Sequence, residues 1–177
     1  QSSACIECVA GKANPVPGST SNVCVDCLPG SFTDTPGFAK CTLCPAGKYQ
    51  DDKAGLSCKA CTPGNYCIEG AAAPLPCPGG TRKDPDLSVM TSKDQCLVCP
   101  AGTFCPVGSA DATPCAPGTF TATEKQSTCT NCEAGKYQDT SGETTCKVCP
   151  SGYYCTEGAA APLPCPGGTR KDPDLSV

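Results

Sequence analysis

Histidine is absent from the 177-residue sequence, and this absence excludes most of the ways in which a protein activates a nucleophile. There can be no Ser-His or Cys-His pair. The aspartate and glutamate residues lie in stretches rich in proline and glycine, which would not hold two carboxylates rigidly enough for acid–base catalysis. We therefore expect a protein that is not an enzyme and needs no cofactor.

Apolar residues are too few for a membrane span or for a large core. No run of 18 apolar residues occurs, so we expect no membrane insertion in this segment. Leu, Ile, Val and Phe together number only 23, too few to offset the conformational entropy of folding without covalent links. The net charge is −4, and a chain with no excess of basic residues has no surface suited to nucleic acid.

Cysteine, glycine and proline are abundant instead, with 20, 19 and 19 residues. A cysteine content of about 11% marks a disulfide scaffold, in which covalent bridges replace the core. Stable disulfides form in an oxidising compartment, so we expect an extracellular or cell-surface protein. The sequence starts without methionine and ends inside a repeated phrase, and we expect it to be part of a longer protein.

Two kinds of cysteine alternate along the chain. Ten of them, called openers here, each begin a Cys-x-x-Gly phrase: Cys8, Cys27, Cys44, Cys61, Cys77, Cys99, Cys115, Cys132, Cys149 and Cys165. The ten others, called closers, are Cys5, Cys24, Cys41, Cys58, Cys67, Cys96, Cys105, Cys129, Cys146 and Cys155, of which Cys67, Cys105 and Cys155 also have glycine three residues later. One short unit repeated along a line predicts a small disulfide-rich fold, a linear tandem array of short cysteine-rich modules. We expect an elongated rod with little regular secondary structure and no helix longer than about one turn.

The largest repeat spans 88 residues. The phrase from Glu69 to Val89 recurs letter for letter from Glu157 to Val177, and every cysteine between Cys27 and Ile68 has a counterpart 88 residues later. We therefore divide the chain into residues 1–26, cysteine-rich modules of divergent phase; 27–114, the first 88-residue repeat; and 115–177, a second, truncated repeat.

The loops between opener and closer are of two main types, with 13 or with five intervening residues. The five-residue loops depart from the regular unit, and we expect them to bend or stagger the rod. Seven openers are followed, five positions later, by an aromatic residue: Phe32, Tyr49, Tyr66, Phe104, Phe120, Tyr137 and Tyr154. We expect each ring to pack on the disulfide of its own module and form a small local core.

The alternation of openers and closers predicts that each opener pairs with the closer that follows it. The nine bridges are Cys8–Cys24, Cys27–Cys41, Cys44–Cys58, Cys61–Cys67, Cys77–Cys96, Cys99–Cys105, Cys115–Cys129, Cys132–Cys146 and Cys149–Cys155. Cys5 and Cys165 are left over at the two ends. Spacing alone does not prove connectivity, and Cys61–Cys77 with Cys67–Cys96 stays open as the alternative around the first five-residue loop.

A metal site is the main competing interpretation of the cysteines. The spacing Cys-x2-Cys-x13-Cys-x2-Cys is close to that of a zinc ribbon. However, the chain has seven Cys-x2-Cys pairs, an odd number, and six cysteines outside any such pair. The carboxylates of Asp84 and Asp86, repeated at Asp172 and Asp174, are too few for calcium. We therefore expect disulfides and no metal.

The phrase Cys-Pro-x-Gly-x-Tyr/Phe followed by Cys-x2-Cys resembles the ephrin-receptor-like cysteine-rich repeats. Cys44-PAGKY with its closer Cys58 is also similar to the first loop of the EGF/tumour-necrosis-factor-receptor-like modules. The run Cys99-PAGTF-Cys105-PVGSADATPCAPGTF resembles tandem arrays in protist surface coats and flagellar-hair fibres of ciliates and algae. The resemblance implies an extracellular module, while the five-residue loops depart from the receptor layout.

These features predict a structural component of an extracellular filament or surface coat, a disulfide-laddered rod that self-associates into homo-oligomers or filaments. Arg82 and Asp86, with their counterparts Arg170 and Asp174, are the candidate self-association residues, because they present both charges at a fixed interval. The alternative is the ectodomain of a cell-surface receptor or adhesin that binds a protein or glycan ligand. No Asn-x-Ser/Thr sequon occurs, but abundant serine, threonine and proline leave O-linked glycans as an expectation.

Overall fold

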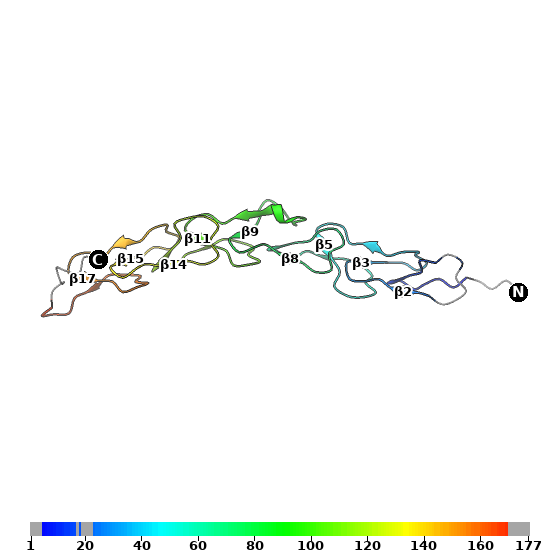
Figure 1. Ribbon diagram of the computed structural model, residues 1–177, viewed down its shortest axis with the longest axis horizontal. Helices are drawn as coiled ribbons and strands as arrows, with labels where there is room; N and C mark the ends of the chain where they lie inside the picture. The colour runs from blue at the N-terminus through cyan, green and yellow to red at the C-terminus, as the bar shows by residue number, and fades with distance from the viewer. Residues whose placement is uncertain (1–4, 17, 19–22, 170–177) are drawn as a thin grey trace. The chain divides into compact units, whose positions relative to one another are not determined.

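The computed structural model describes residues 5–16, 18 and 23–169. The chain divides into two compact units. The first comprises residues 1–76 and 84–95, and the second comprises residues 77–83 and 96–177. The described part of each unit consists of turns and very short strands (Figure 1). The predicted disulfide-rich chain of small modules is therefore confirmed, and its only helical element is the 3-10 turn η1 (Lys93–Gln95) within the residues described.

Antiparallel hairpins of two strands make up the regular structure of both units. The first unit holds β1 (Lys12–Ala13) with β2 (Val25–Asp26), β3 (Ser31–Phe32) with β4 (Thr42–Leu43), β5 (Lys48–Tyr49) with β6 (Lys59–Ala60), and β7 (Asn65–Tyr66) with β8 (Leu75–Pro76). The second holds β9 (Thr81–Lys83) with β10 (Cys96–Val98), β11 (Thr103–Phe104) with β12 (Thr113–Pro114), β13 (Thr119–Phe120) with β14 (Thr130–Asn131), β15 (Lys136–Tyr137) with β16 (Lys147–Val148), and β17 (Tyr153–Tyr154) with β18 (Leu163–Pro164). Strands this short follow from the proline and glycine that interrupt every stretch.

Each hairpin extends from one opener to the residue before the next opener, and we call this segment a module. The glycine three positions after the opener adopts φ between 78° and 88°, a conformation that costs other residues about 1–2 kcal/mol. It turns the chain into the first strand, and the second strand ends just before the next opener. Modules with five-residue loops keep the same hairpin: β7–β8, for example, ends before Cys77. Loop type therefore changes where the disulfide closes, while the hairpin is retained.

Nine disulfides join the described residues, and they are the nine neighbour pairs that the alternation predicts. The bridges Cys61–Cys67 and Cys77–Cys96 form, so the alternative connectivity around the first short loop does not. Their Cα–Cα distances range from 5.6 Å to 6.3 Å, within the reach of a disulfide. Cys5 and Cys165 have no partner among the described residues.

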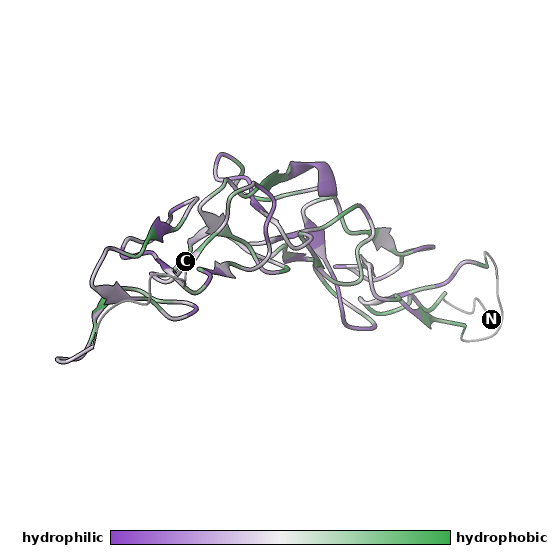
Figure 2. Cartoon of the chain, turned by 60° about the vertical axis from the view of Figure 1, so that its left-hand side comes forward, coloured by the Kyte–Doolittle hydropathy of each residue, from purple (hydrophilic) through white to green (hydrophobic). Residues whose placement is uncertain are grey.

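The buried interior of both units is made largely of cysteine. The openers Cys27, Cys44, Cys77, Cys99, Cys115 and Cys132 have no exposed surface. Met90, whose burial the sequence analysis did not anticipate, is the largest fully buried side chain, and Val89 beside it packs on the Cys61–Cys67 disulfide. Hydrophobic and hydrophilic residues alternate along the ribbons without a continuous apolar layer (Figure 2). Bridges thus replace a conventional core, as the composition predicts.

Candidate functional site

In six modules, the residue six positions after the opener joins its module to both neighbouring modules through its backbone. Gln138 shows the arrangement: its carbonyl accepts from Gly118 N at 2.7 Å, and its amide donates to Ala159 O at 3.0 Å. Gly118 lies in the preceding module and Ala159 in the following one. The same two bonds are made by Thr33, Gln50, Cys67, Cys105 and Thr121. The backbone groups that pair are independent of side-chain identity.

Where the sixth residue is glutamine, its side chain closes the loop of its own module, whereas Thr33 Oγ1 accepts from Gly11 N and Thr121 Oγ1 donates to Thr103 O in the preceding module. Gln138 is almost completely buried, donates from Nε2 to Thr145 O at 2.7 Å, and accepts from Thr140 N at 3.1 Å through Oε1. Gln50 makes the equivalent pair of bonds in the first repeat. In the short loops the sixth residue is the closer, as at Cys67, and a disulfide replaces the amide. Two different chemistries therefore close the loop at the same point.

A residue nine or ten positions after the opener, here called the turn residue, forms a second link to the preceding module. Gly142 N donates to Cys115 O at 2.8 Å, and the same bond recurs at Gly37, Ala54, Gly70, Gly108, Lys125 and Gly158. All seven residues have positive φ. Ala54 (φ 53°) and Lys125 (φ 66°) are the two non-glycine residues with positive φ in the part of the chain that is described.

The opener glycine also makes a close contact two modules further along. A Cβ atom on Gly118 would overlap the carbonyl oxygen of Gly158, and one on Gly80 would overlap that of Lys125. Equivalent overlaps arise at Gly11, Gly30 and Gly102. Glycine is therefore required at this position for close backbone approach as well as for its φ angle. Within each unit, a module contacts the next module and the one after it.

The seven predicted packing aromatics are less buried than the cysteines around them. Six are half-buried, and Tyr154 is 46% exposed. Tyr49 packs against the cluster of Cys61, Cys67 and Ala71, which belongs to the following module. The sequence predicts instead that this ring packs on the disulfide of its own module. The structure shows that Tyr49 contributes to the contact between modules.

Ion pairs recur at the interval of the repeat. Lys147 pairs with Asp139, and its Nζ lies 5.9 Å from the centroid of the Tyr137 ring. The hydrogen bond from Lys147 lowers the pKa of Asp139, and the same bond raises the pKa of Lys147. In the first repeat Lys59 pairs with Asp51 and shifts the two pKa values in the same directions. These side chains are about half exposed, so each pair contributes little to stability.

The predicted self-association residues lie in different surroundings. Arg82 occupies the aromatic position of its module, is half-buried, and donates from Nη1 to Lys83 O at 3.2 Å. Its Nε is buried and has no hydrogen-bond partner among the described atoms. Asp86 is exposed. Arg82 belongs to the second unit and Asp86 to the first. Arg170 and Asp174 lie outside the described residues.

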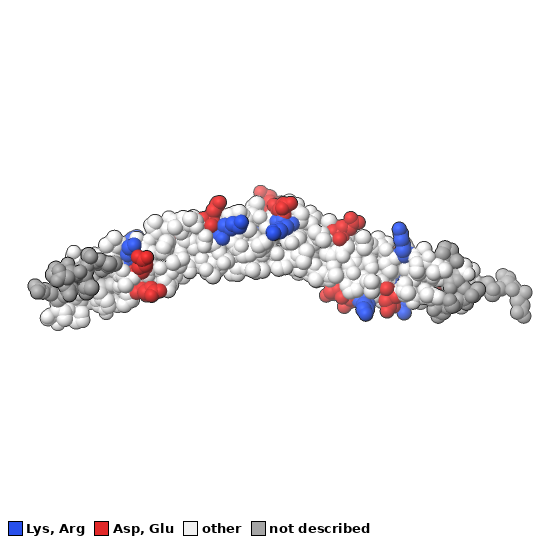
Figure 3. Space-filling model, viewed as in Figure 1, with Lys and Arg blue, Asp and Glu red and all other residues white. Residues whose placement is uncertain are grey.

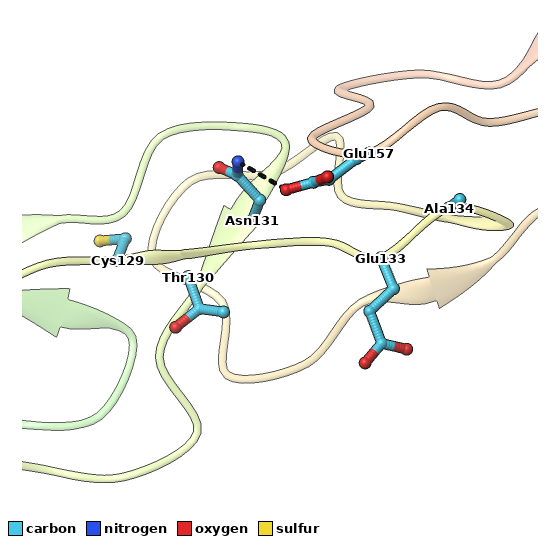
Figure 4. A pocket seen from close by; sticks show the side chains of 6 residues that line it. All are labelled: Cys129, Thr130, Asn131, Glu133, Ala134 and Glu157. Atoms are coloured by element: carbon cyan, nitrogen blue, oxygen red, sulfur yellow. Dashed lines mark hydrogen bonds between the residues drawn. The ribbon is translucent and has the colours of Figure 1, made fainter.

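A groove of about 530 Å³ lies on the second unit. It is lined by Cys129, Thr130, Asn131, Glu133, Ala134 and Glu157. Asn131 Nδ2 donates to Glu157 Oε1 at 3.3 Å, while the Glu133 carboxylate points away from this pair (Figure 4). Glu133 also lines an adjacent groove of about 330 Å³ that contains Phe120 and Lys136. No pattern in the sequence predicts these grooves.

The first repeat carries different side chains at the corresponding positions. Leu43 stands where the second repeat has Asn131, and Pro45 stands where it has Glu133. Leu43 Cδ2 lies 3.4 Å from the place that a Cβ on Gly70 would take, so its side chain covers that glycine. The same backbone arrangement therefore presents an apolar surface in one repeat and a polar groove in the other.

No group of three or more residues suited to metal binding occurs in the residues that the structure describes. The same residues contain no helix that is long and apolar enough to cross a membrane. Asp84 accepts from Asp86 N at 2.9 Å, which forms a local turn. Acidic and basic side chains are interspersed on the face shown in Figure 3, without a large patch of one sign.

Comparison with known families identifies the modules. Residues 30–74 and 118–162 match the family model described as tyrosine-protein kinase ephrin type A/B receptor-like. The two segments cover just over half of the chain and start 88 residues apart. No curated protein matches the chain. The matched segments are non-catalytic cysteine-rich repeats of a kind typical of extracellular domains, and the many disulfides agree with an extracellular location. The chain therefore belongs to the ephrin type A/B receptor-like family of cysteine-rich repeats.

Proposed function

We propose that the chain is a structural component of an extracellular filament or surface coat, an elongated array of modules that self-associates. The observation that carries this proposal is the two-sided backbone pairing of the sixth residue, which Thr33, Gln50, Cys67, Cys105, Thr121 and Gln138 all make. A link built from backbone groups recurs at these six modules although their sixth residues differ in side chain. Such nearest-neighbour stacking is how repeat proteins extend in one dimension.

Self-association is assigned to the phrase that carries Arg82 and Asp86, with Arg170 and Asp174 one repeat later. A contact that recurs along the chain and joins unlike surfaces builds an open filament. Asp86 is exposed and available for such a contact, whereas Arg82 is half-buried. The guanidinium of Arg82 has five N–H donors and gives one bond to Lys83 O, so other donors are left for a partner carboxylate.

Sedimentation velocity over a wide concentration range, combined with electron microscopy, tests self-association. The wild-type protein should form filaments, and the variant with Arg82, Asp86, Arg170 and Asp174 replaced by alanine should associate more weakly while keeping its nine disulfides. Filaments of the variant with unchanged axial spacing would place the contact elsewhere. A protein that stays monomeric at every concentration and binds a soluble ligand with nanomolar affinity would reject the structural function.

The second candidate function is the ectodomain of a receptor or adhesin, and the polar groove at Asn131 and Glu157 favours it. Side-chain amide and carboxylate groups can accept and donate hydrogen bonds to a protein or glycan ligand. The first repeat supplies a matched control, since N131L with E133P restores its residues. Screening of glycans and cell-surface proteins would support this function if a ligand binds the wild type and is lost in the double variant.

O-linked glycans are part of both candidate functions. Intact-mass measurement of the protein secreted by its native source, before and after chemical deglycosylation, detects them. A mass equal to that of the bare polypeptide would remove glycans from the proposal.

A further inference from the structure

The 88-residue repeat consists of five modules, which begin at Cys27, Cys44, Cys61, Cys77 and Cys99. They are 17, 17, 16, 22 and 16 residues long. The identical phrase at Glu69 and Glu157 makes the whole repeat look like the unit of duplication. The contacts between modules point to a smaller unit of duplication, the single hairpin module.

Junctions between modules of different loop types make the same bonds. Where a long-loop module precedes another, Gly118 N donates to Gln138 O at 2.7 Å and Gly142 N donates to Cys115 O at 2.8 Å. Where a long loop precedes a short one, Gly135 N donates to Cys155 O at 2.9 Å. The opposite bond, from Gly158 N to Cys132 O, is 2.8 Å long.

The reverse order, a short loop followed by a long one, gives an equivalent junction. Gly102 N donates to Thr121 O at 3.0 Å, and Lys125 N donates to Cys99 O at 2.8 Å. The 22-residue module that starts at Cys77 joins the next module in the same way, from Gly80 N to Cys105 O at 2.8 Å. These four junction types therefore use the same opener carbonyl, opener glycine, sixth residue and turn residue.

The contact two modules away adds one requirement, which is a turn-residue carbonyl placed against the opener glycine. Gly102 in a short-loop module faces the turn residue Gly142 of a long-loop module, and Gly118 in a long-loop module faces Gly158 of a short-loop one. Lys125 shows that the turn residue need not be glycine, since its carbonyl faces Gly80 in the same manner. Where the module two along is the 22-residue one, Gly47 faces the side chain of Val89 instead, so the carbonyl contact is common to modules followed by ones of 16 or 17 residues.

We infer that the single hairpin module, rather than the 88-residue repeat, is the unit of exchange in this protein. A module of either loop type can be inserted or removed in phase, and the array changes length in steps of 16 or 17 residues. Each module packs against the two modules that follow it, and these can have either the 13-residue or the five-residue loop. This inference does not rest on filament formation, because it concerns contacts within one chain.

The test inserts a second copy of residues 115–131 between Asn131 and Cys132. The insert carries one opener and one closer, so the product should contain ten neighbour disulfides by mass spectrometry. The amides of Gly118 and Gly142 should remain protected from hydrogen exchange, and the thermal midpoint should stay within a few degrees of the wild type. A second variant inserts residues 99–114 at the same place and tests exchange between loop types.

The matched control inserts the same residues 115–131 after Thr123, inside a loop, where two openers then follow each other. This variant should form scrambled bridges and lose exchange protection. Equal scrambling in the in-phase variants would overturn the inference. In that case, of the insertion variants only a third one, which duplicates residues 27–114 as a block, would fold correctly. The 88-residue repeat would then be the smallest exchangeable unit. None of these measurements depends on self-association. The proposal of module exchange and the proposal of self-association can therefore each be rejected without the other.

Discussion

The α-carbon of Gly118 lies against the carbonyl oxygen of Gly158, two modules further along the chain, with no room for a methyl group between them. Gly152 has nearly the same φ, 81° against 85°, but no described atom lies within 4 Å of the place where its Cβ would be. Gly118 therefore needs glycine both for its positive φ and for the close backbone approach, whereas Gly152 needs it for the positive φ alone.

The G118A variant should therefore be less stable than G152A. Both substitutions place alanine at positive φ, which costs about 1–2 kcal/mol, but G118A also displaces the Gly158 carbonyl. We expect a total loss of about 2–4 kcal/mol for G118A. Hydrogen exchange at the amides around each site, with disulfides intact, measures the two local stabilities. Equal effects would show that the close approach is easily relaxed.

The Q138L variant should open the loop that Gln138 closes. It removes the partner of Thr145 O and Thr140 N at a part-buried site where water can replace part of the lost bonding, so we expect a loss of about 1 kcal/mol. The disulfide Cys132–Cys146 should still form. Q126L is the control, since the Gln126 side chain makes its bonds in an exposed loop. Exchange of the Thr140 amide should accelerate in Q138L, and an unchanged rate would contradict the role of the side chain.

The K125G variant should be more stable than the wild type. Lys125 adopts φ 66°, and relief of this conformation outweighs the entropy that glycine adds to the unfolded chain, for a net gain of roughly 0.5–1 kcal/mol. A54G should behave in the same way at φ 53°. A134G serves as control because Ala134 does not have positive φ, so only the entropic loss remains. Thermal midpoints under non-reducing conditions give the comparison.

Reductant should unfold both units, whereas chelators should have no effect. The nine bridges replace a core, so their removal leaves too little buried apolar surface to hold the chain. Circular dichroism and hydrogen exchange, recorded after dithiothreitol or after EDTA, test the two halves of this prediction. Loss of structure in EDTA alone would restore the zinc interpretation of the Cys-x2-Cys pairs.

Stability should be nearly independent of pH between about 5 and 9, because the chain has no histidine. The Asp139 pKa is lowered by Lys147, so its stabilisation is present above the ordinary value of 3.8 and is lost as pH falls through the folded-state value. The Lys147 pKa is raised, so the stabilisation that its charge contributes is fully present below pH 10.5. It is lost only as pH rises through the higher pKa of the folded state. The thermal midpoint should decline only slightly toward pH 2, and D139N should reduce that decline.

The pattern of cysteines predicted by itself the neighbour bridges and the lack of a substantial helix among the described residues, while the structure decided the pairing around Cys61 and Cys67. Loops of five to 18 residues bring each opener and the next closer within covalent reach, and proline and glycine exclude longer elements. The sequence also held a signal that was not used: the residue after each of the seven aromatics is Thr, Gln or Cys. Their shared role was hidden because these residue types have little chemistry in common.

Only the tertiary structure decided how modules join. The sixth residue binds its neighbours through backbone N–H and C=O groups, which every residue type carries, so no composition or spacing marks it as an interface. Burial of Met90 and the packing of Tyr49 on the following module likewise depend on where a neighbouring hairpin lies. Local chemistry sets the bridges within a module, whereas contacts between modules arise from geometry that appears once the hairpins are formed.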